Sequence, residues 1–343
     1  MHSTFGTIFT LSTFGESHGP ALGGIVSGVP AGLRLDTAAI QQQLDRRRPG
    51  QSTLTTARNE ADSVSLLSGV LDGVTTGTPI GFVIQNTDQH SSDYEAMRHL
   101  YRPGHADYTY DAKYGIRDHR GGGRASARET AARVVGGAIA RQLLDTLGVT
   151  VSARIESVGG LVNSAADGLD QACSDLVAAV RKDGDSVGGV VQCTVTGVPT
   201  GWGEPVFGKL QAMLAAAMMS IPAAKGFEYG MGFDGARKRG SEVMDNWVPD
   251  ADDPRGMHAA ANHSGGIQGG ISNGEPITMR IAFKPTATLL RDVDTVTDSG
   301  QAAVLHARGR HDPCVALRAV PVVEAMAALV LADACLMNRC SKL

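Results

Sequence analysis

The stretch from His119 to Leu144 reads HRGGGRASARETAARVVGGAIARQLL and joins a glycine-rich loop to a helix. Ser126 and Glu129 form the S-x-x-E pattern of a capping box, which predicts that the helix begins at Ser126. Gly148 is a suitable residue to end it. Because alanine and glycine dominate this segment, we expect the helix to pack closely against its neighbours.

The loop before this helix has the composition of an anion-binding site. Three consecutive glycines let a ligand approach the backbone, and the first N–H groups and dipole of a helix favour negative charge. Arg124 and Arg128 offer fork-shaped, charge-assisted hydrogen bonds to phosphate or carboxylate, and Arg120 is near them. The alternative is an ordinary capped helix with surface arginines. The sequence is neither a Walker A loop nor a dinucleotide fingerprint, because the lysine of the first and the third glycine of the second are absent.

The segments on either side predict an α+β protein. Several strand-like runs alternate apolar and polar residues, which favours antiparallel sheet with one covered face. The predicted strands are 23–29, 63–71, 79–84, 149–158, 188–198 and 277–285. Further helices are predicted from Asp36 to before Pro49, over roughly 204–220, and beyond Pro313 with an interruption or restart at Pro321. Helices layered on antiparallel sheets define the α+β class.

Composition indicates a globular protein, and 343 residues allow one large domain or two ordinary ones. No low-complexity linker divides the sequence, and we expect a single domain, 1–343. Apolar residues make up 42% of the chain and charged residues 19%, and the net charge is −4. This charge, with aromatics at only 5%, disfavours nucleic acid and acidic membranes as partners. The apolar segment 319–337 contains Pro321, Glu324 and Asp333, so we interpret it as a buried helix and not a membrane span. Five cysteines without a CxxC pair, and an N-terminus without signal-peptide regions, fit a reducing cytoplasm.

Other candidate site residues lie in loops. His18 in FGESHGPALGG (14–24) and His105 in YRPGHAD (101–107) are suited to proton transfer, although a lone histidine is more often structural. The basic run DRRRPGQS (45–52) ends a helix, where the dipole alone would favour cations. In GRHDPC (309–314), Asp312 is either a placed carboxylate or a simple N-cap before Pro313. KPTAT (284–288) offers a second anion contact. NHSGGIQGGISNG (262–274) is typical of either a flexible flap or a backbone surface for a flat ligand.

The residues alone therefore indicate an enzyme of phosphate chemistry but not its reaction. Long polar loops at 45–60, 86–125 and 230–275 are the expected carriers of function. The histidine spacings match no known metal arrangement, so no metal site is predicted. The order of Ser17 and His18, without an elbow motif, assigns no nucleophilic triad.

At the level of whole motifs, the sequence resembles the chorismate synthase family over essentially its full length. The three most specific motifs are GESHGPALGGIVSGVP (15–30), GGGRASARETAARVVGG (121–137) and GRHDPCVALRAVPVVEAM (309–326). VTTGTPIGFVIQNTD (74–88), RPGHADYTYDAKYG (102–115) and KGFEYGMGF (225–233) also look like that family. The resemblance implies a sandwich of antiparallel sheets around central helices, assembled as a homotetramer.

The resemblance also implies the reaction. Members of the family convert 5-enolpyruvylshikimate 3-phosphate to chorismate by 1,4-anti elimination of phosphate and a ring proton. They require reduced FMN although there is no net redox change. The chain shows no extra domain for an NAD(P)H-dependent flavin reductase, so we expect a monofunctional enzyme whose FMN is reduced by a separate protein.

Matching each motif position by position gives expected roles. His18 and His105 match two catalytic histidines, of which one assists phosphate departure and the other protonates the reduced flavin, and Asp312 matches an acid associated with flavin N5. Substrate-binding arginines are implied at Arg47, Arg102 and Arg128, with Arg310 shared between substrate and flavin. The remaining FMN contacts are implied at Arg124, Ala125, Ser126, Pro222, Ala223, Gly269, Lys284, Pro285, Thr286, Ala287 and Thr288.

Three positions depart from the family pattern. Thr53 stands where many members have arginine, and Ala125 and Ala287 stand where serine is frequent. Two other functions remain open on the sequence: a flavin- or phosphate-binding transferase or reductase on the same scaffold, which would turn over NAD(P)H steadily, and a non-enzymatic FMN-binding protein, which would tolerate loss of His18 and His105.

Overall fold

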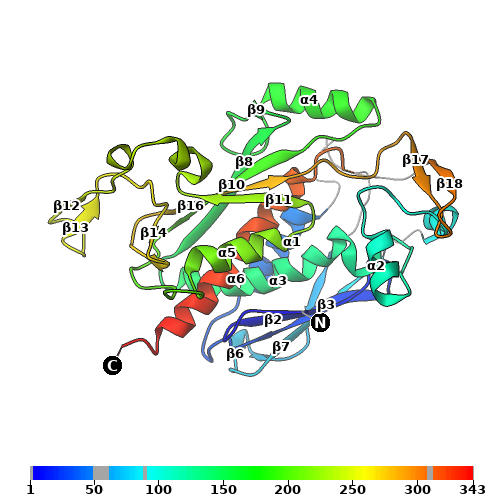
Figure 1. The fold of residues 1–343 in the computed structure, drawn as a ribbon. Coiled ribbons are helices and arrows are strands. Elements are labelled where there is room, and N and C mark those ends of the chain that lie inside the picture. The colour runs from blue at the N-terminus through cyan, green and yellow to red at the C-terminus, as the bar shows by residue number, and fades with distance from the viewer. Residues whose placement is uncertain (1–2, 49–61, 88–90, 307–311, 343) are drawn as a thin grey trace.

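The computed structural model describes residues 3–48, 62–87, 91–306 and 312–342. Two five-stranded antiparallel sheets enclose a layer of helices (Figure 1). The N-terminal sheet has the order β1-β2-β3-β7-β4, with β1 Thr4–Phe5, β2 Thr10–Gly15, β3 Ala21–Ser27, β7 Ile80–Gln85 and β4 Val64–Leu66. The second sheet has the order β11-β16-β10-β8-β9, with β11 Ala224–Tyr229, β16 Ile277–Phe283, β10 Gly189–Thr196, β8 Thr150–Val158 and β9 Leu161–Val162.

Four helices form the central layer: α1 Thr37–Arg47, α3 Thr130–Asp145, α5 Leu210–Met219 and α6 Ala316–Asn338. α3 and α6 pack along each other, α3 contacts the N-terminal sheet at β2 and β3, and α6 contacts the second sheet at β8 and β10. α4 (Gln171–Lys182) packs against β8 and β9 at the edge of the second sheet. The antiparallel sandwich around central helices that the resemblance implied is therefore confirmed.

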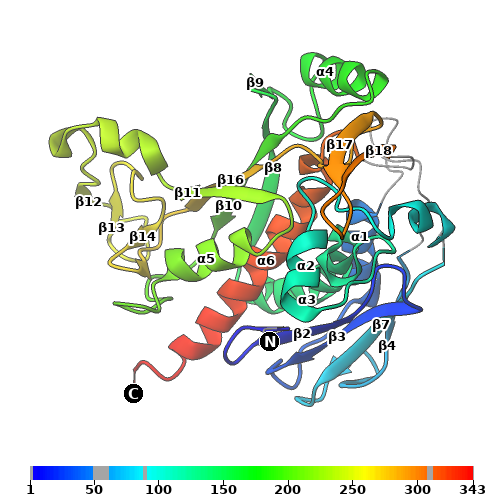
Figure 2. The same cartoon turned by 45° about the vertical axis from the view of Figure 1, so that its right-hand side comes forward.

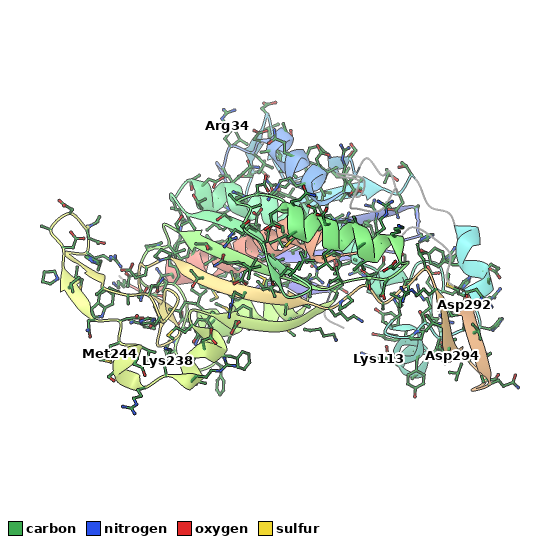
Figure 3. All side chains as sticks on the ribbon, turned by 90° about the horizontal axis from the view of Figure 1, so that it is seen from above. Arg34, Lys113, Lys238, Met244, Asp292 and Asp294 are labelled. Atoms are coloured by element: carbon green, nitrogen blue, oxygen red, sulfur yellow. The ribbon has the colours of Figure 1, made fainter. Side chains whose placement is uncertain are left out.

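Some of the shorter elements lie at the two ends of the molecule. α2 (Asp107–Tyr114) and the hairpin β17 (Asp292–Val296)–β18 (Ala302–His306) lie at one end (Figure 2). Figure 3 shows Lys113 with Asp292 and Asp294 at this end and Lys238 with Met244 at the other. The remaining short elements are β5 Val70–Leu71, β6 Val74–Thr75, β12 Trp247–Pro249, β13 Met257–Ala259, β14 Ile267–Gln268 and β15 Ile271–Ser272, with 3₁₀ turns η1 Ser91–Met97, η2 Gly123–Ala125, η3 Ala127–Glu129, η4 Gly232–Arg237 and η5 Gly240–Glu242.

The sequence patterns account for these elements. β16 alternates buried and half-buried residues along its whole length, so one face of the strand covers the helices. Asp36 caps α1 by accepting hydrogen bonds from the N–H groups of Ala38 and Ala39. All five cysteines are free thiols, and Cys340 alone among them is exposed.

Two helix predictions need correction. The helix predicted over 204–220 begins only at Leu210, because Glu204 N–H bonds back to Gly208 O and Val206 has a positive φ of 64°. The predicted break at Pro321 is absent, and α6 runs through this proline. Burial of nearly all of α6 outweighs the one hydrogen bond that proline removes near the helix start.

By length and composition α6 is apolar enough to cross a membrane, but 89% of its most apolar stretch is buried inside the fold. It is a core helix, as the charged residues in segment 319–337 predicted. Its buried Asp333 accepts hydrogen bonds from the N–H groups of Thr7, Ile8 and Phe9, and this contact ties the first hairpin to the helix layer.

We expect Gly137→Ala to destabilise the protein, because α3 and α6 approach closely at this position. A methyl group on Gly137 would lie 2.3 Å from Cβ and 2.4 Å from Cα of Ala325, so a backbone must shift. Overpacking of this kind costs about 1–3 kcal/mol or more in the free energy of unfolding. Gly240→Ala is the control, because its added methyl would meet nothing within 4 Å. Equal urea midpoints for the two variants would contradict this prediction.

Candidate active site

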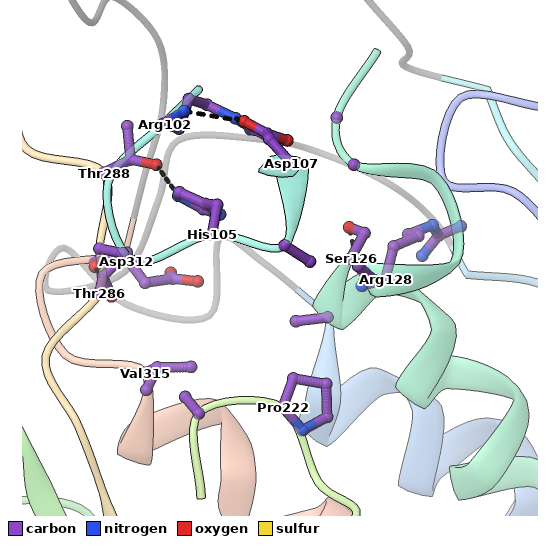
Figure 4. A pocket seen from close by; sticks show the side chains of 18 of the residues that line it. Arg102, His105, Asp107, Ser126, Arg128, Pro222, Thr286, Thr288, Asp312 and Val315 are labelled. Atoms are coloured by element: carbon purple, nitrogen blue, oxygen red, sulfur yellow. Dashed lines mark hydrogen bonds and ion pairs between the residues drawn. The ribbon is translucent and has the colours of Figure 1, made fainter. Parts of the chain in front are cut away.

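A cavity of about 510 Å³ opens between the helix layer and three surface loops (Figure 4). Its walls come from the last turn of α1, the loop before α2, the glycine-rich loop before α3, the turn before β11, the segment after β16 and the start of α6. Segments distant in sequence therefore meet at one place. This volume lies within the range typical of pockets for small molecules and cofactors.

The cavity lining carries a large excess of positive charge in an acidic protein. Among the residues that the structure describes, seven cationic side chains and three carboxylates line the cavity. The cations are Arg47, Arg102, Arg117, Arg128, Lys225, Lys284 and Arg318, and the acids are Asp107, Asp118 and Asp312. The local excess of cations confirms that an anion site can exist despite the net charge of −4.

A buried ionic cluster forms the floor of the cavity around Asp62. The Asp62 carboxylate is fully buried and pairs with Arg47 Nη1 at 2.8 Å and with Arg128 Nη1 through its other oxygen. Arg47 also donates from Nε to Thr130 Oγ1 and from Nη2 to the Ala127 carbonyl, both at 3.1 Å. The Arg47 guanidinium is thus fixed by three protein contacts.

Among the described residues of this cluster, cations outnumber anions. The pKa values of Arg47 and Asp62 are both shifted here. Burial, together with repulsion from Arg318 and Arg128, lowers the pKa of Arg47 to about 10 despite the attraction of Asp62. Burial would raise the pKa of Asp62, but Arg47, Arg128 and Arg318 more than offset this and hold that pKa below its ordinary value. Among the described residues, the two carboxylates of Asp62 and Asp312 are in contact with three arginines, Arg47, Arg128 and Arg318, so this part of the cavity suits an anionic ligand.

Arg318 connects this cluster to Asp312. Its Nε donates to the Arg47 carbonyl at 3.1 Å, and its Nη1 donates to Asp312 Oδ2 at 2.7 Å. The backbone carbonyl of Asp312 accepts a hydrogen bond from Thr286 Oγ1 at 2.8 Å. Asp312 therefore lines the cavity as a fixed carboxylate, so the N-cap alternative does not describe it: α6 begins at Ala316 with Val315 as its N-cap residue.

Arg102 and His105 lie on the opposite wall (Figure 4). Arg102 forms a bidentate pair with Asp107, at 2.7 and 2.8 Å, and Arg117 also contacts Asp107 at 3.2 Å. The Nε2 of His105 lies 2.6 Å from Thr288 Oγ1. One ring nitrogen of this histidine is thus held by a hydroxyl from the segment after β16, and the ring orientation is fixed.

His18 lies behind the cavity wall. The side chain is buried, and its ring packs edge-on against Tyr94 with centroids 4.9 Å apart. A methyl group on Gly121 would come within 2.4 Å of the His18 ring. Tyr94 and Gly121 both line the cavity, so His18 lies directly behind them.

The loop 119–128 shapes the start of α3. Gly121, Gly122 and Gly123 have positive φ, and Ser126 Oγ accepts a hydrogen bond from Arg128 N–H at the start of η3, which leads into α3. In a full capping box the Glu129 side chain would also accept a hydrogen bond from the Ser126 backbone N–H. Here the Glu129 carboxylate instead accepts two hydrogen bonds from Arg133 Nε.

Of the three arginines in that loop, Arg128 alone is in the cavity lining. Arg120 pairs with Asp118 at 2.8 Å, and Arg124 donates to Thr13 Oγ1 and to the carbonyls of Thr13 and Gly15 on β2. The structure therefore places Arg124 as a support for the N-terminal sheet edge and not in the cavity wall.

Most of the other predicted site residues also meet in this cavity. Besides Arg47, Arg102, His105, Arg128 and Asp312, the cavity is lined by Ala125, Ser126, Pro222, Ala223, Lys284, Pro285, Thr286, Ala287 and Thr288. Gly269 lies instead in a second, more apolar hollow beside α5 and β11, with Gln211, Tyr229 and Phe233. Arg310 and Thr53 fall outside the described residues.

The sequence did not single out several residues that complete the site. Arg117, Lys225 and Arg318 line the cavity, and Asp62 and Asn86 contact its arginines. Lys225, Asn86, Arg117 and Arg318 lie within or next to motifs used for recognition, which was the available signal. Asp62 had no such signal, because nothing local predicts that an isolated aspartate will be buried between two arginines.

Comparisons with known proteins agree with this geometry. The profile described as chorismate synthase matches residues 9–336. A chorismate synthase of Parabacteroides distasonis is 52% identical over 355 aligned residues, with 98% of each chain covered, and that of Synechococcus sp. WH7803 is 54% identical with 97% of each covered. A crystal structure of chorismate synthase superposes with a TM-score of 0.76 at 30% identity, covering 97% of this chain and 93% of that one.

The fold and these relatives define an enzyme of the carbon–oxygen lyase class, with a role in aromatic amino-acid biosynthesis. The chain belongs to the chorismate synthase family.

Proposed function

We propose that this enzyme converts 5-enolpyruvylshikimate 3-phosphate to chorismate by a 1,4-anti elimination that depends on reduced FMN without net redox change. The observation that carries the proposal is the surplus of buried arginine charge around Asp62 at the cavity floor. Such a site suits a small substrate with a phosphate and carboxylates.

Substrate binding is assigned to Arg47, Arg128 and Arg102. Arg47 and Arg128 are held by Asp62, and Arg102 by Asp107, so their charges are in place before a ligand arrives. Charge that develops on a departing phosphate is stabilised by such fixed donors without reorganisation.

The residues present fit reduced FMN. Apolar surface from Ala125, Pro222, Ala223 and Ala287 suits the faces of a flat ring, while Thr288 and Lys284 place a hydroxyl and an ammonium group beside it and Thr286 lines the same wall. The alanines that depart from the family pattern keep this wall apolar. When bound, the flavin would supply electron density while phosphate leaves. We assign the flavin contacts to these residues together with Ser126 and Pro285, and we keep Arg124, Gly269 and Arg310 as proposals from the family motifs only.

Proton transfer is assigned to His18, His105 and Asp312. His105 is oriented by Thr288 and Asp312 by Arg318, so both groups face the cavity in defined geometry. His18 is proposed to act next to Gly121 and Tyr94. Histidines are effective acids and bases near neutral pH because their ordinary pKa lies close to it.

We further infer a single catalytic domain over 1–343, a homotetrameric assembly, a cytoplasmic location and a separate flavin reductase as the source of reduced FMN. The support is the family motifs along the full chain, one continuous hydrophobic core and the free thiols of all five cysteines.

An anaerobic assay with photoreduced FMN and 5-enolpyruvylshikimate 3-phosphate tests the function, with oxidised FMN as the control. Equal release of chorismate and phosphate, only with reduced flavin, is expected. In a parallel sample that contains NAD(P)H, steady consumption of NAD(P)H beyond flavin reduction would favour a reductase instead. Binding of FMN without any product would favour a non-enzymatic flavin protein.

Thr288→Val should lower turnover about 10-fold or more, because the valine has a similar shape but removes the hydroxyl that orients His105. Thr288→Ser keeps the hydroxyl and should remain close to the parent enzyme. The measurement is the pH profile of kcat/KM for both variants. Identical profiles and rates for valine and serine would show that the contact with His105 is irrelevant.

A further inference from the structure

Asn86 joins two parts of the active site that come from different elements. It directly follows β7, and its backbone N–H donates to the Pro20 carbonyl at 3.1 Å. Its side-chain Nδ2 donates to the carbonyls of Gly19 at 2.8 Å and Glu16 at 3.1 Å, with a longer contact of 3.4 Å to the Ser17 carbonyl. These carbonyls belong to the turn 16–19, which carries His18.

The other end of the same amide contacts the arginine cluster. Asn86 Oδ1 accepts a hydrogen bond from Arg128 Nε at 3.1 Å, while Arg128 Nη1 pairs with Asp62. A carboxamide is suited to this place because it offers N–H donors to carbonyls on one side and an oxygen acceptor to a guanidinium on the other. A carboxylate could accept a hydrogen bond from Arg128 but would repel the three carbonyl oxygens. A lysine or arginine could donate to the carbonyls but could not accept from Arg128.

The turn 16–19 also contacts the loop before α3 at Arg124, whose backbone N–H bonds to the Glu16 carboxylate and whose Nη1 donates to the Gly15 carbonyl at 3.3 Å. Its own backbone closes through Gly19 N–H to the Glu16 carbonyl at 3.0 Å, which shapes the turn but does not place it. The His18 ring packs on Tyr94 in η1 and on Gly121 in the glycine-rich loop. The Asn86 amide adds a direct link from this turn to Arg128 in η3, the arginine that pairs with Asp62 at the cavity floor.

We propose that Asn86 is a positioning residue that sets the placement of His18 relative to Arg128. The proposal rests on the proposed function, in which Arg128 holds the substrate and His18 moves a proton. Displacement of a reacting group by about 1 Å can lower a rate about 100-fold, so a side chain that fixes this placement affects turnover without touching the substrate.

Asn163 provides a matched control far from the cavity. Its Nδ2 also donates to two carbonyls, those of Ile155 and Gly168, both at 3.0 Å, and its Oδ1 accepts a hydrogen bond from Asp170 N–H at 2.8 Å. It is buried, so Asn163→Ala removes a comparable set of hydrogen bonds at a structural site. The two alanine variants therefore separate positioning from general stability.

The experiment compares Asn86→Ala, Asn86→Asp and Asn163→Ala in the full-length enzyme with reduced FMN. Asn86→Ala should lower kcat about 10- to 100-fold, while Asn163→Ala leaves kcat within about twofold. Asn86→Asp keeps the acceptor for Arg128 but loses the donors to the turn, so its kcat should fall nearly as far. An Asn86→Asp variant with parental kcat would overturn the proposal, as would equal kcat for the two alanine variants.

Hydrogen exchange provides a readout that does not depend on activity. Peptides covering residues 14–20 should exchange faster in both Asn86 variants, while those peptides in Asn163→Ala match the parent. Unchanged exchange in that segment would overturn the positioning role. If the parent enzyme makes no chorismate, the proposed function fails, and the exchange data still decide whether Asn86 holds the turn. If Asn86→Ala does not fold, Asn86→Asp carries the same two tests.

Discussion

Asp62→Asn should destabilise the folded enzyme by about 3–5 kcal/mol at pH 7, because it leaves two buried guanidinium groups without their shared counter-charge. The substitution keeps the shape of the side chain. Asparagine also tolerates the positive φ of 47° at this position, so backbone strain does not contribute to the loss. The measurement is urea unfolding of both proteins.

The exposed pair of Asp234 and Arg237 supplies the control. These side chains are 63% and 79% exposed and lie 3.4 Å apart, so Asp234→Asn should change the free energy of unfolding by less than about 1 kcal/mol. Similar losses for the two asparagine variants would mean that the cluster around Asp62 does not depend on its charge.

The pH dependence of the Asp62 effect follows from the direction of its pKa shift. The folded-state pKa of Asp62 is depressed, so its contribution is fully present above the unfolded pKa of about 3.9 and is lost as pH falls through the lower folded pKa. The stability difference between parent and Asp62→Asn should therefore be constant from pH 7 to about pH 5 and narrow below pH 4. A difference that grows on acidification would contradict this assignment.

His105→Ala should lower turnover about 100- to 10,000-fold, the range expected when a general acid or base is removed. FMN binding should change little, because most of the predicted flavin contacts lie on Ala125, Pro222, Ala223 and the segment 284–288. Single-turnover chorismate formation and FMN titration measure the two effects separately.

His306→Ala is a suitable control for this prediction. His306 is 66% exposed on the hairpin β17–β18 and pairs with Asp292 outside the cavity. We expect it to retain parental turnover. Full activity in His105→Ala would remove this histidine from the mechanism, and a parallel loss of FMN binding would assign it to cofactor binding.

The central helices and the two sheets could be largely predicted from local patterns. The alternation in β16, the cap at Asp36 and the glycine after α3 each depend on residues close in sequence, and all appear where expected. The predicted start of α5 was wrong because a turn closed by a hydrogen bond from Glu204 N–H to the Gly208 carbonyl replaces its first predicted turns, and Leu210 N–H bonds to the distant Gly270 carbonyl.

The sequence by itself determined the family, because three long motifs carry information that no single contact has to supply. It also determined that a glycine–arginine loop would precede α3. Only the tertiary structure decided which arginine of that loop serves the cavity: Arg128 faces the cavity floor, whereas Arg120 pairs with Asp118 and Arg124 bonds to β2. Tertiary packing also brought Asp62 between two arginines and placed Gly269 in a different hollow. Burial and charge pairing depend on segments distant in the chain, and local sequence does not encode which of them will meet.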